Sequence, residues 1–209
     1  MYGYHYIDGD LMIDTWPNLS EKERIRICHN LGNFHAEIGK KYTKDMAPTS
    51  GFESSQSPYL HPEVEKDYHR ILAATDTPSE LKNLAKLAKV LFDQTLNMGV
   101  FQFIHNDSHH ENILIKHKKI SGIIDFGEAM YGEVAKEFSR YIRDYPHYFE
   151  YIVASYEKAS KNKLSRKRLV TNAFLSGLID IIDDYHKNGK ARTKAIEAVL
   201  TYQEMIVQF

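Results

Sequence analysis

The chain has 209 residues, which is enough for one substantial domain. Hydrophobic residues make up 43% of it and charged residues 26%, as in ordinary globular proteins. The 27 Lys and Arg residues nearly balance the 28 Asp and Glu residues, so the formal net charge is -1. This balance lacks the basic excess of a typical nucleic-acid-binding protein, and we expect no nucleic-acid partner.

Three further features concern the compartment. No apolar run approaches the roughly 20 residues of a membrane span. The segment 1–5 lacks the basic-then-apolar pattern of a signal peptide. The single cysteine, Cys28, excludes an internal disulfide and fits a reducing environment. We therefore expect a cytoplasmic protein without a membrane partner.

The first third of the chain predicts one strand and then helices. Residues 2–8 are aromatic and β-branched and precede Asp8-Gly9-Asp10, which predicts a short strand followed by a turn. Ser20-Glu21-Lys22-Glu23 is a capping box that starts a helix over about 20–40. Its apolar face is formed by residues spaced three or four apart: Ile27, Leu31, Phe34 and Ile38.

The middle and end of the chain predict a small β cluster among helices. Residues 43–60, rich in Ser, Thr, Pro and Gly, predict a flexible loop. Helices are expected from Pro62 to about 74 and from 77 onward, then a buried strand at 100–104 and a hairpin formed by 113–116 and 120–124. Further helices are expected at 134–143, 147–160, 166–187 and 190–206. The predicted fold class is therefore α+β and predominantly α-helical.

The most informative stretch is the polar loop His105-Asn106-Asp107-Ser108-His109-His110-Glu111-Asn112, which lies between two apolar strands. A third apolar strand ends at Asp125-Phe126-Gly127. The hairpin between them is expected to fold Asp125 back beside Asn112. Asp and Asn supply the hard oxygen ligands that Mg²⁺ prefers, and a separate carboxylate can take a proton from an acceptor hydroxyl. This set of groups is what phosphoryl transfer requires, and the Asp107–Asn112 interval matches that of kinase catalytic loops.

The loop resembles that of the aminoglycoside phosphotransferase and choline kinase-like family, relatives of protein kinases. That family reads His-Gly-Asp-x-His-x-x-Asn and then Ile-Asp-Phe or Ile-Asp-Trp, and this chain matches it at His105, Asp107, His109, Asn112 and Asp125. Three further segments resemble family motifs, namely Tyr6-Ile7-Asp8-Gly9-Asp10, Leu31-Gly32-Asn33-Phe34-His35 and Gly132-Glu133-Val134-Ala135-Lys136-Glu137-Phe138.

The resemblance implies a role for each matching residue. Asp107 would be the catalytic base, and Asn112 and Asp125 the Mg²⁺ ligands, with ATP or GTP as phosphoryl donor. His105, His109 and Glu137 would hold the loop in place, and Glu128 is a possible accessory residue. The family usually has Asp where this chain has Glu133 and Glu137, and Pro where it has Val134.

The resemblance also predicts that residues 1–209 form a single C-terminal lobe of a kinase-like phosphotransferase, which carries the catalytic and acceptor-binding parts. The sequence contains no Gly-x-Gly-x-x-Gly loop and no lysine before Lys22, so the N-terminal nucleotide-clamping lobe is not expected within it. On this basis we expect the isolated chain to bind ATP weakly and to turn over slowly.

Two other functions stay open at this point. One is a kinase-like lobe with impaired catalysis that acts as a binding module. The other is a Zn²⁺- or Mn²⁺-dependent hydrolase that uses His105, His109 and His110, although these lack the spacing of His-Glu-x-x-His.

For the acceptor we expect an aminoglycoside or a similar antibiotic, while choline, homoserine, methylthioribose and macrolides are served by the same scaffold and the fold alone does not choose among them. A polycation such as an aminoglycoside would require carboxylates near Asp107. The available acidic groups are Asp180, Asp183, Asp184, Glu204 and the terminal carboxylate of Phe209.

Overall fold

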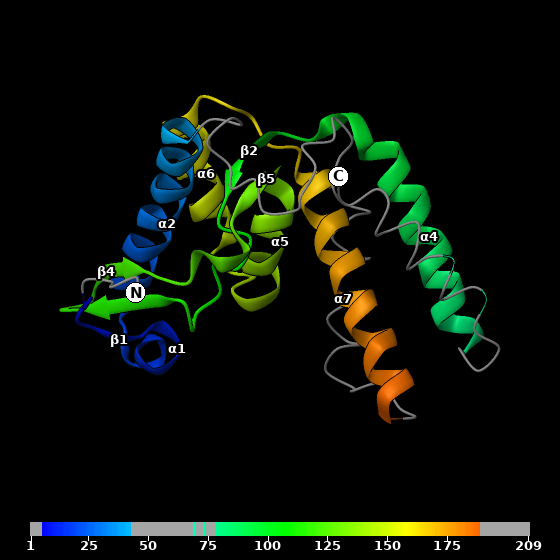
Figure 1. Cartoon of the computed structure of the whole chain (residues 1–209), viewed down its shortest axis with the longest axis horizontal. Helices are drawn as coiled ribbons and strands as arrows, with labels where there is room; N and C mark the ends of the chain where they lie inside the picture. The colour runs from blue at the N-terminus through cyan, green and yellow to red at the C-terminus, as the bar shows by residue number, and fades with distance from the viewer. Residues whose placement is uncertain (1–5, 43–68, 70–72, 74–77, 189–209) are drawn as a thin grey trace.

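The structure is a computed structural model that describes residues 6–42, 69, 73 and 78–188. Short strands lie among long helices in this part of the chain, so the predicted α+β, mostly helical fold is confirmed (Figure 1). No helix in these ranges is long and apolar enough to cross a membrane. The predicted loop at 43–60 and the helix at 190–206 lie outside the described residues, as does all but 69 and 73 of the helix at 62–74.

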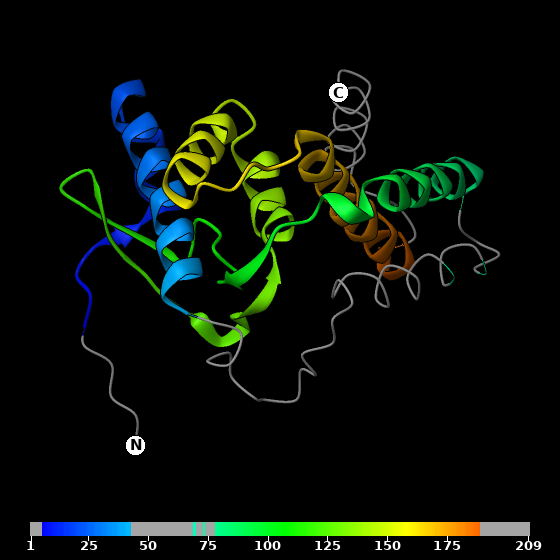
Figure 2. The same cartoon turned by 90° about the horizontal axis from the view of Figure 1, so that it is seen from above.

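The first long helix, α2 (Glu21–Lys41), begins at the predicted capping box, where the Ser20 backbone N–H donates to the Glu23 carboxylate at 2.8 Å. Its buried face packs along α6 (Phe149–Ser160), and the two helices lie side by side in both views (Figures 1 and 2). A Cβ atom on Gly32 would lie 2.2 Å from the carbonyl oxygen of Ile152. The close approach of the two helices therefore requires glycine at this position.

The prediction of a strand at 2–8 is wrong for residues 6–8, the part of it that the structure describes. Tyr6–Asp8 form no strand, and the pairing segment is β1 (Asp10–Leu11), where the turn was expected. The chain then enters a short helix α1 (Met12–Thr15), which buries Met12, and a 3₁₀ turn η1 (Trp16–Asn18). Neither of these was predicted. Alternating aromatic residues indicate strand propensity, but the pairing partner decides which residues form the strand.

Two small antiparallel sheets carry the polar loops. The predicted hairpin is β3 (Ile113–Lys116) and β4 (Lys119–Ile123), and β1 pairs with the other edge of β3. The predicted buried strand is β2 (Phe101–Ile104), which pairs with β5 (Met130–Glu133). Strand β5 was not predicted, and only its last two residues, Gly132 and Glu133, belong to a segment that resembles a family motif.

Helix α5 (Val134–Asp144) begins where β5 ends and packs against β2 and α7 (Arg166–Asn188). A further helix, α4 (Ser79–Thr95), with the short turn η3 (Leu96–Met98) after it, packs along α7 on the side of α5 away from α2 (Figure 1). One continuous apolar core joins these helices to α2 and α6. This arrangement places α5 next to the loop that follows β2.

Candidate active site

The loop at 105–112 connects the end of β2 to the start of β3. Beyond the hairpin, the backbone N–H of Ile124 donates to the carbonyl of Asn112 at 3.0 Å. This bond brings Asp125 beside Asn112, as the hairpin predicted. Asp125 is exposed and begins the short 3₁₀ turn η4 (Phe126–Glu128). Asp107, the candidate base, and Asn112 and Asp125, the candidate metal ligands, thus lie at neighbouring strand ends.

The Asp107 carboxylate is held by groups on both of its oxygens. The Arg140 guanidinium Nη1 donates to Oδ1 at 2.8 Å, and the Asn112 amide Nδ2 donates to Oδ2 at 3.0 Å. His109 Nε2 lies 3.6 Å from the same Oδ2. The side chain of Asp107 stays 27% exposed, so it is oriented by the protein but still open to an acceptor.

The donor set at Asn112 and Asp125 fits a magnesium ion. Asn112 uses its Nδ2 on the backbone carbonyl and carboxylate of Asp107, and no group among the described residues donates to its Oδ1. The Asp125 carboxylate accepts one long bond, 3.4 Å from Gly127 N. Both side chains therefore retain oxygens for a hard cation.

Backbone strain accompanies these groups. Asn106 and Asp125 both adopt the left-handed conformation, with φ of 65° and 61°. Asn and Asp tolerate this region better than other residues with a Cβ atom. Such strain is concentrated at functional sites, where surrounding contacts hold it in place.

A buried hydrogen-bond network under the loop holds this conformation. The Glu137 carboxylate accepts from the Asn106 backbone N–H at 2.6 Å and from the Ser108 hydroxyl. The hydroxyls of Ser108 and Tyr141 lie 2.7 Å apart, and Tyr141 reaches His35 Nε2 at 2.8 Å. The network joins the catalytic loop to α5 and α2, which is the loop-holding position proposed for Glu137.

Burial sets the ionisation of two groups in this network. The buried position of His35 lowers its pKa to about 4, although the nearby Glu137 carboxylate opposes the shift. Burial also raises the pKa of Tyr141 well above its ordinary value, and Glu137 adds to this effect. At neutral pH the network therefore holds a neutral imidazole and a neutral phenol.

The three histidines of the alternative hydrolase site do not form a metal centre in this structure. His105 uses Nε2 on the Ile124 carbonyl at 2.9 Å and Nδ1 on the Asp107 backbone N–H at 3.3 Å, so neither nitrogen is left for a metal. Among the residues that the structure describes, no three His, Cys, Asp or Glu side chains gather as metal ligands. The two contacts of His105 fit its expected loop-holding role.

The remaining predicted residues are exposed or partly exposed, or lie outside the described side chains. Glu128 is exposed in η4. Asp180 is exposed on α7 and pairs with Arg143 of α5 at 3.3 Å, and Asp184 is partly exposed one turn later. The Asp183 side chain, Glu204 and Phe209 are not among the described parts of the structure.

Arg140, Ser108 and Tyr141 were not predicted as site residues. One signal was available for Arg140, because it follows Glu137 by three residues and so lies on the same face of a helix. No such signal existed for Tyr141, because the partner that explains it, His35, is more than a hundred residues away.

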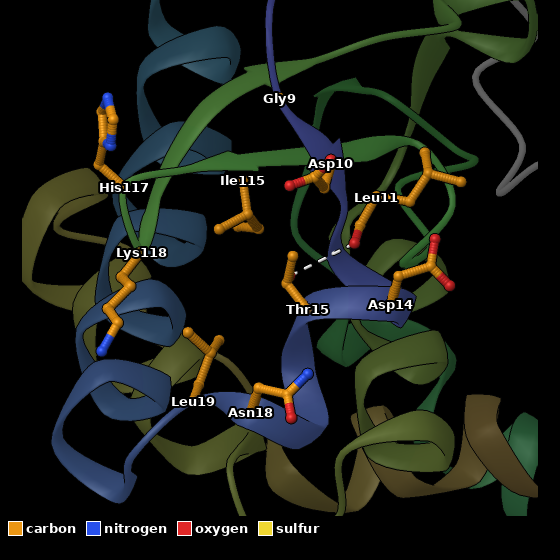
Figure 3. Close-up of a pocket in the computed structure, with 10 residues that line it drawn as sticks. All are labelled: Gly9, Asp10, Leu11, Asp14, Thr15, Asn18, Leu19, Ile115, His117 and Lys118. Carbon is orange, nitrogen blue, oxygen red and sulfur yellow. Dashed lines mark hydrogen bonds between the residues drawn. The ribbon is translucent and has the colours of Figure 1, made fainter.

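An open pocket of about 680 Å³ lies beside β1, α1, η1 and the tip of the β3–β4 hairpin (Figure 3). Asp10 and Asp14 line it from one side, and His117 and Lys118 from the other. None of the predicted site residues lines this pocket. Helix α1, which borders this pocket, contacts the loop at 105–112 through a backbone hydrogen bond from Ile13 N to His110 O at 3.3 Å.

Several solved phosphotransferase structures are similar to this chain in fold. The gentamicin complex of APH(2")-IIa is 18% identical, with a TM-score of 0.59, over 98% of this chain and 69% of that one. The GDP and kanamycin complex of APH(2")-IIia is 13% identical, with a TM-score of 0.68 and the same coverage. The macrolide 2'-phosphotransferase MphH from Brachybacterium faecium is 14% identical, with a TM-score of 0.65, over 94% of this chain and 67% of that one. These likenesses show a shared fold.

No curated protein sequence matches the chain significantly. The family model for the phosphotransferase enzyme family (APH) matches residues 1–163, which is most of the chain and includes the catalytic loop and Asp125. The expected enzyme class, a small-molecule phosphotransferase, is thereby confirmed. The chain belongs to the phosphotransferase enzyme family.

Proposed function

We propose that this protein transfers the γ-phosphoryl group of ATP or GTP to a hydroxyl of a small molecule, with Asp107 as the base. The main support for this proposal is the arrangement of the Asp107 carboxylate, which Arg140 and Asn112 fix in place while it stays open to solvent. Positioning of this kind supplies most of the catalysis in phosphoryl transfer. The solved structures of the same fold include complexes with GDP and with ADP, which supports a nucleotide donor.

In the proposed step the acceptor hydroxyl gives its proton to Asp107. The hydroxyl oxygen forms a bond to the γ-phosphorus, and the bond from that phosphorus to the bridging oxygen breaks. The products are the phosphorylated acceptor and a nucleoside diphosphate. Glu137 and Ser108 keep the loop under Asp107 in the conformation that presents its carboxylate.

Asn112 and Asp125 are the residues that would hold Mg²⁺, since both keep free carbonyl or carboxylate oxygens at one edge of the site. The ion would supply charge neutralisation at the nucleotide phosphates. We expect Asn112→Ala and Asp125→Asn to weaken binding of Mn²⁺ together with ADP by at least about tenfold, measured by electron paramagnetic resonance. Glu111→Gln, which neutralises an exposed carboxylate of the same loop, is the matched control. Equal Mn²⁺ affinity in all three variants and the unmodified chain would refute the ligand assignment.

For the acceptor we propose an aminoglycoside or a related antibiotic. The solved structures of the same fold include complexes with gentamicin and kanamycin and a macrolide phosphotransferase. On this chain, Asp180 and Asp184 place carboxylates on α7, which packs against the helix that carries Arg140. A polycationic acceptor that used this charge would share Asp180 with Arg143, which already pairs with it.

The test is incubation of the chain with Mg²⁺, ATP or GTP and a panel of hydroxyl acceptors, followed by measurement of nucleoside diphosphate release. The panel holds an aminoglycoside, a macrolide, choline, homoserine and methylthioribose. We expect Mg²⁺-dependent release that rises above the acceptor-free rate with the aminoglycoside. A rise with another acceptor instead would overturn the antibiotic assignment, and no rise with any acceptor would count against the proposed activity itself.

A further inference from the structure

Arg140 lies on α5 one turn after Glu137 and makes the only charged contact to Oδ1 of Asp107 among the described residues, at 2.8 Å. Asn112, the proposed metal ligand, contacts the other oxygen, Oδ2. The two carboxylate oxygens therefore face different surroundings. One points toward the metal ligands, and the other toward the guanidinium on α5.

Most of the hydrogen-bonding capacity of Arg140 is unused. A guanidinium carries five N–H donors in a planar fork, and this one uses a single nitrogen, Nη1, on Asp107. Within the described part of the chain, its Nε and Nη2 make no hydrogen bond. The side chain is 34% exposed, so these donors face space that a ligand can reach. The neighbouring Arg143 differs, because it pairs with Asp144 and Asp180.

The reaction places phosphoryl oxygens close to these donors. A base must lie within about 3 Å of the acceptor hydroxyl whose proton it takes, and that hydroxyl oxygen lies about 3 Å from the phosphorus it attacks. A group that already touches the base is therefore a neighbour of the acceptor hydroxyl, and its unused nitrogens are the ones that could turn toward the phosphoryl oxygens. Arginine suits this position, because its fork matches the geometry of a phosphoryl group in a way that the lysine ammonium does not.

We propose that Arg140 is a phosphoryl-binding residue: it aligns Asp107 in the empty site and binds the phosphoryl group as that group moves to the acceptor. This inference rests on the proposed function. It assigns to α5 a direct part in transition-state binding, in addition to its part in holding the loop through Glu137. Charge on the transferring oxygens is then neutralised from the α5 side as well as from the metal side.

The test compares how tightly the chain binds MgADP with and without aluminium fluoride, which mimics the transferring phosphoryl group, by isothermal titration calorimetry. In the unmodified protein we expect aluminium fluoride to tighten ADP binding by at least about tenfold, as for other transition-state mimics. Arg140→Met should lose most of this gain while its affinity for MgADP alone stays the same. Arg140→Lys, which keeps the charge, should retain part of it.

Arg166→Met is the control for loss of a partly exposed, carboxylate-paired arginine elsewhere, because Arg166 pairs with Glu150 and Glu157 on the α6–α7 side of the molecule. It should keep the full gain. A gain in Arg140→Met equal to that of the unmodified protein would overturn the inference and leave the proposed function standing. If aluminium fluoride does not tighten ADP binding in the unmodified protein, the proposed function fails and this inference fails with it.

Discussion

Arg168 of α7 and Glu133 at the end of β5 form a two-point ion pair in the interior of the protein. Nε donates to Oε1 at 2.6 Å and Nη2 donates to Oε2 at 2.7 Å, and the side chains are 1% and 3% exposed. The third nitrogen, Nη1, donates to the Phe92 carbonyl and the Thr95 hydroxyl of α4. The pair therefore ties α4 and α7 to the strand that lies beside β2, which leads into the catalytic loop.

We expect Arg168→Met to lower the free energy of unfolding by about 3–5 kcal/mol, because it leaves the Glu133 carboxylate buried without a partner. Arg166→Met removes an arginine that is 23% exposed and pairs with Glu150 and Glu157, and it should cost less than Arg168→Met. Urea unfolding of both variants measures the difference. Equal losses in the two variants would show that the buried pair contributes no more to the free energy of unfolding than the more exposed one.

The positive φ of Asn106 leads to a second prediction. Its Oδ1 is buried and has no hydrogen-bond partner, and its backbone occupies a region that favours glycine. Asn106→Gly removes the unpaired oxygen, whereas Asn106→Ala places a residue with a Cβ atom and no local hydrogen bond in the left-handed region. We expect the glycine variant to be more stable than the alanine variant by about 1–2 kcal/mol, measured by urea unfolding. The reverse order would be incompatible with the backbone conformation described.

His35 predicts a dependence of stability on pH. Its folded pKa of about 4 lies below the ordinary value of 6.5, so between these pH values the unfolded chain binds more protons than the folded one. Its contribution is thus complete above pH 6.5 and falls as the pH drops toward 4, by roughly 3 kcal/mol in all. The groups that face the imidazole are the Tyr141 hydroxyl, Glu137 and His105.

Urea unfolding at pH 7 and pH 4.5 tests this. His35→Gln should lose less stability between the two pH values than the unmodified protein does, by about 2–3 kcal/mol. His147→Gln, which alters an exposed histidine between α5 and α6, should behave like the unmodified protein. The same pH dependence in His35→Gln and the unmodified protein would exclude His35 as its source.

The parts of this site that could be predicted from sequence are those fixed by short-range spacing. The order of Asp107, Asn112 and Asp125 along strand, loop and hairpin was enough to place all three at one edge, and Ser20 and Glu23 were enough to place the start of α2. The turn at Asp8-Gly9-Asp10 was misjudged, because strand pairing there depends on an edge of β3 more than a hundred residues away.

Long-range partners account for the other omissions. Arg140 reaches Asp107 from α5, and Arg168 reaches Glu133 from α7. The spacing of Arg140 from Glu137 indicates a shared helix face, but neither arginine's partner can be identified from its neighbours in the sequence. The replacement of Asp by Glu at position 133 was visible in the sequence. Its structural setting, a carboxylate that reaches a buried guanidinium, was not.

The most direct test of the proposed site is the rate of nucleoside diphosphate release by Asp107→Asn, with the acceptor that gives the highest rate in the panel. The asparagine keeps the size of the side chain and removes its ability to take a proton. We expect the acceptor-dependent rate to fall by at least about 10²-fold, while Glu111→Gln stays within about twofold of the unmodified protein. Transfer by Asp107→Asn at the rate of the unmodified protein would contradict the assignment of the catalytic base.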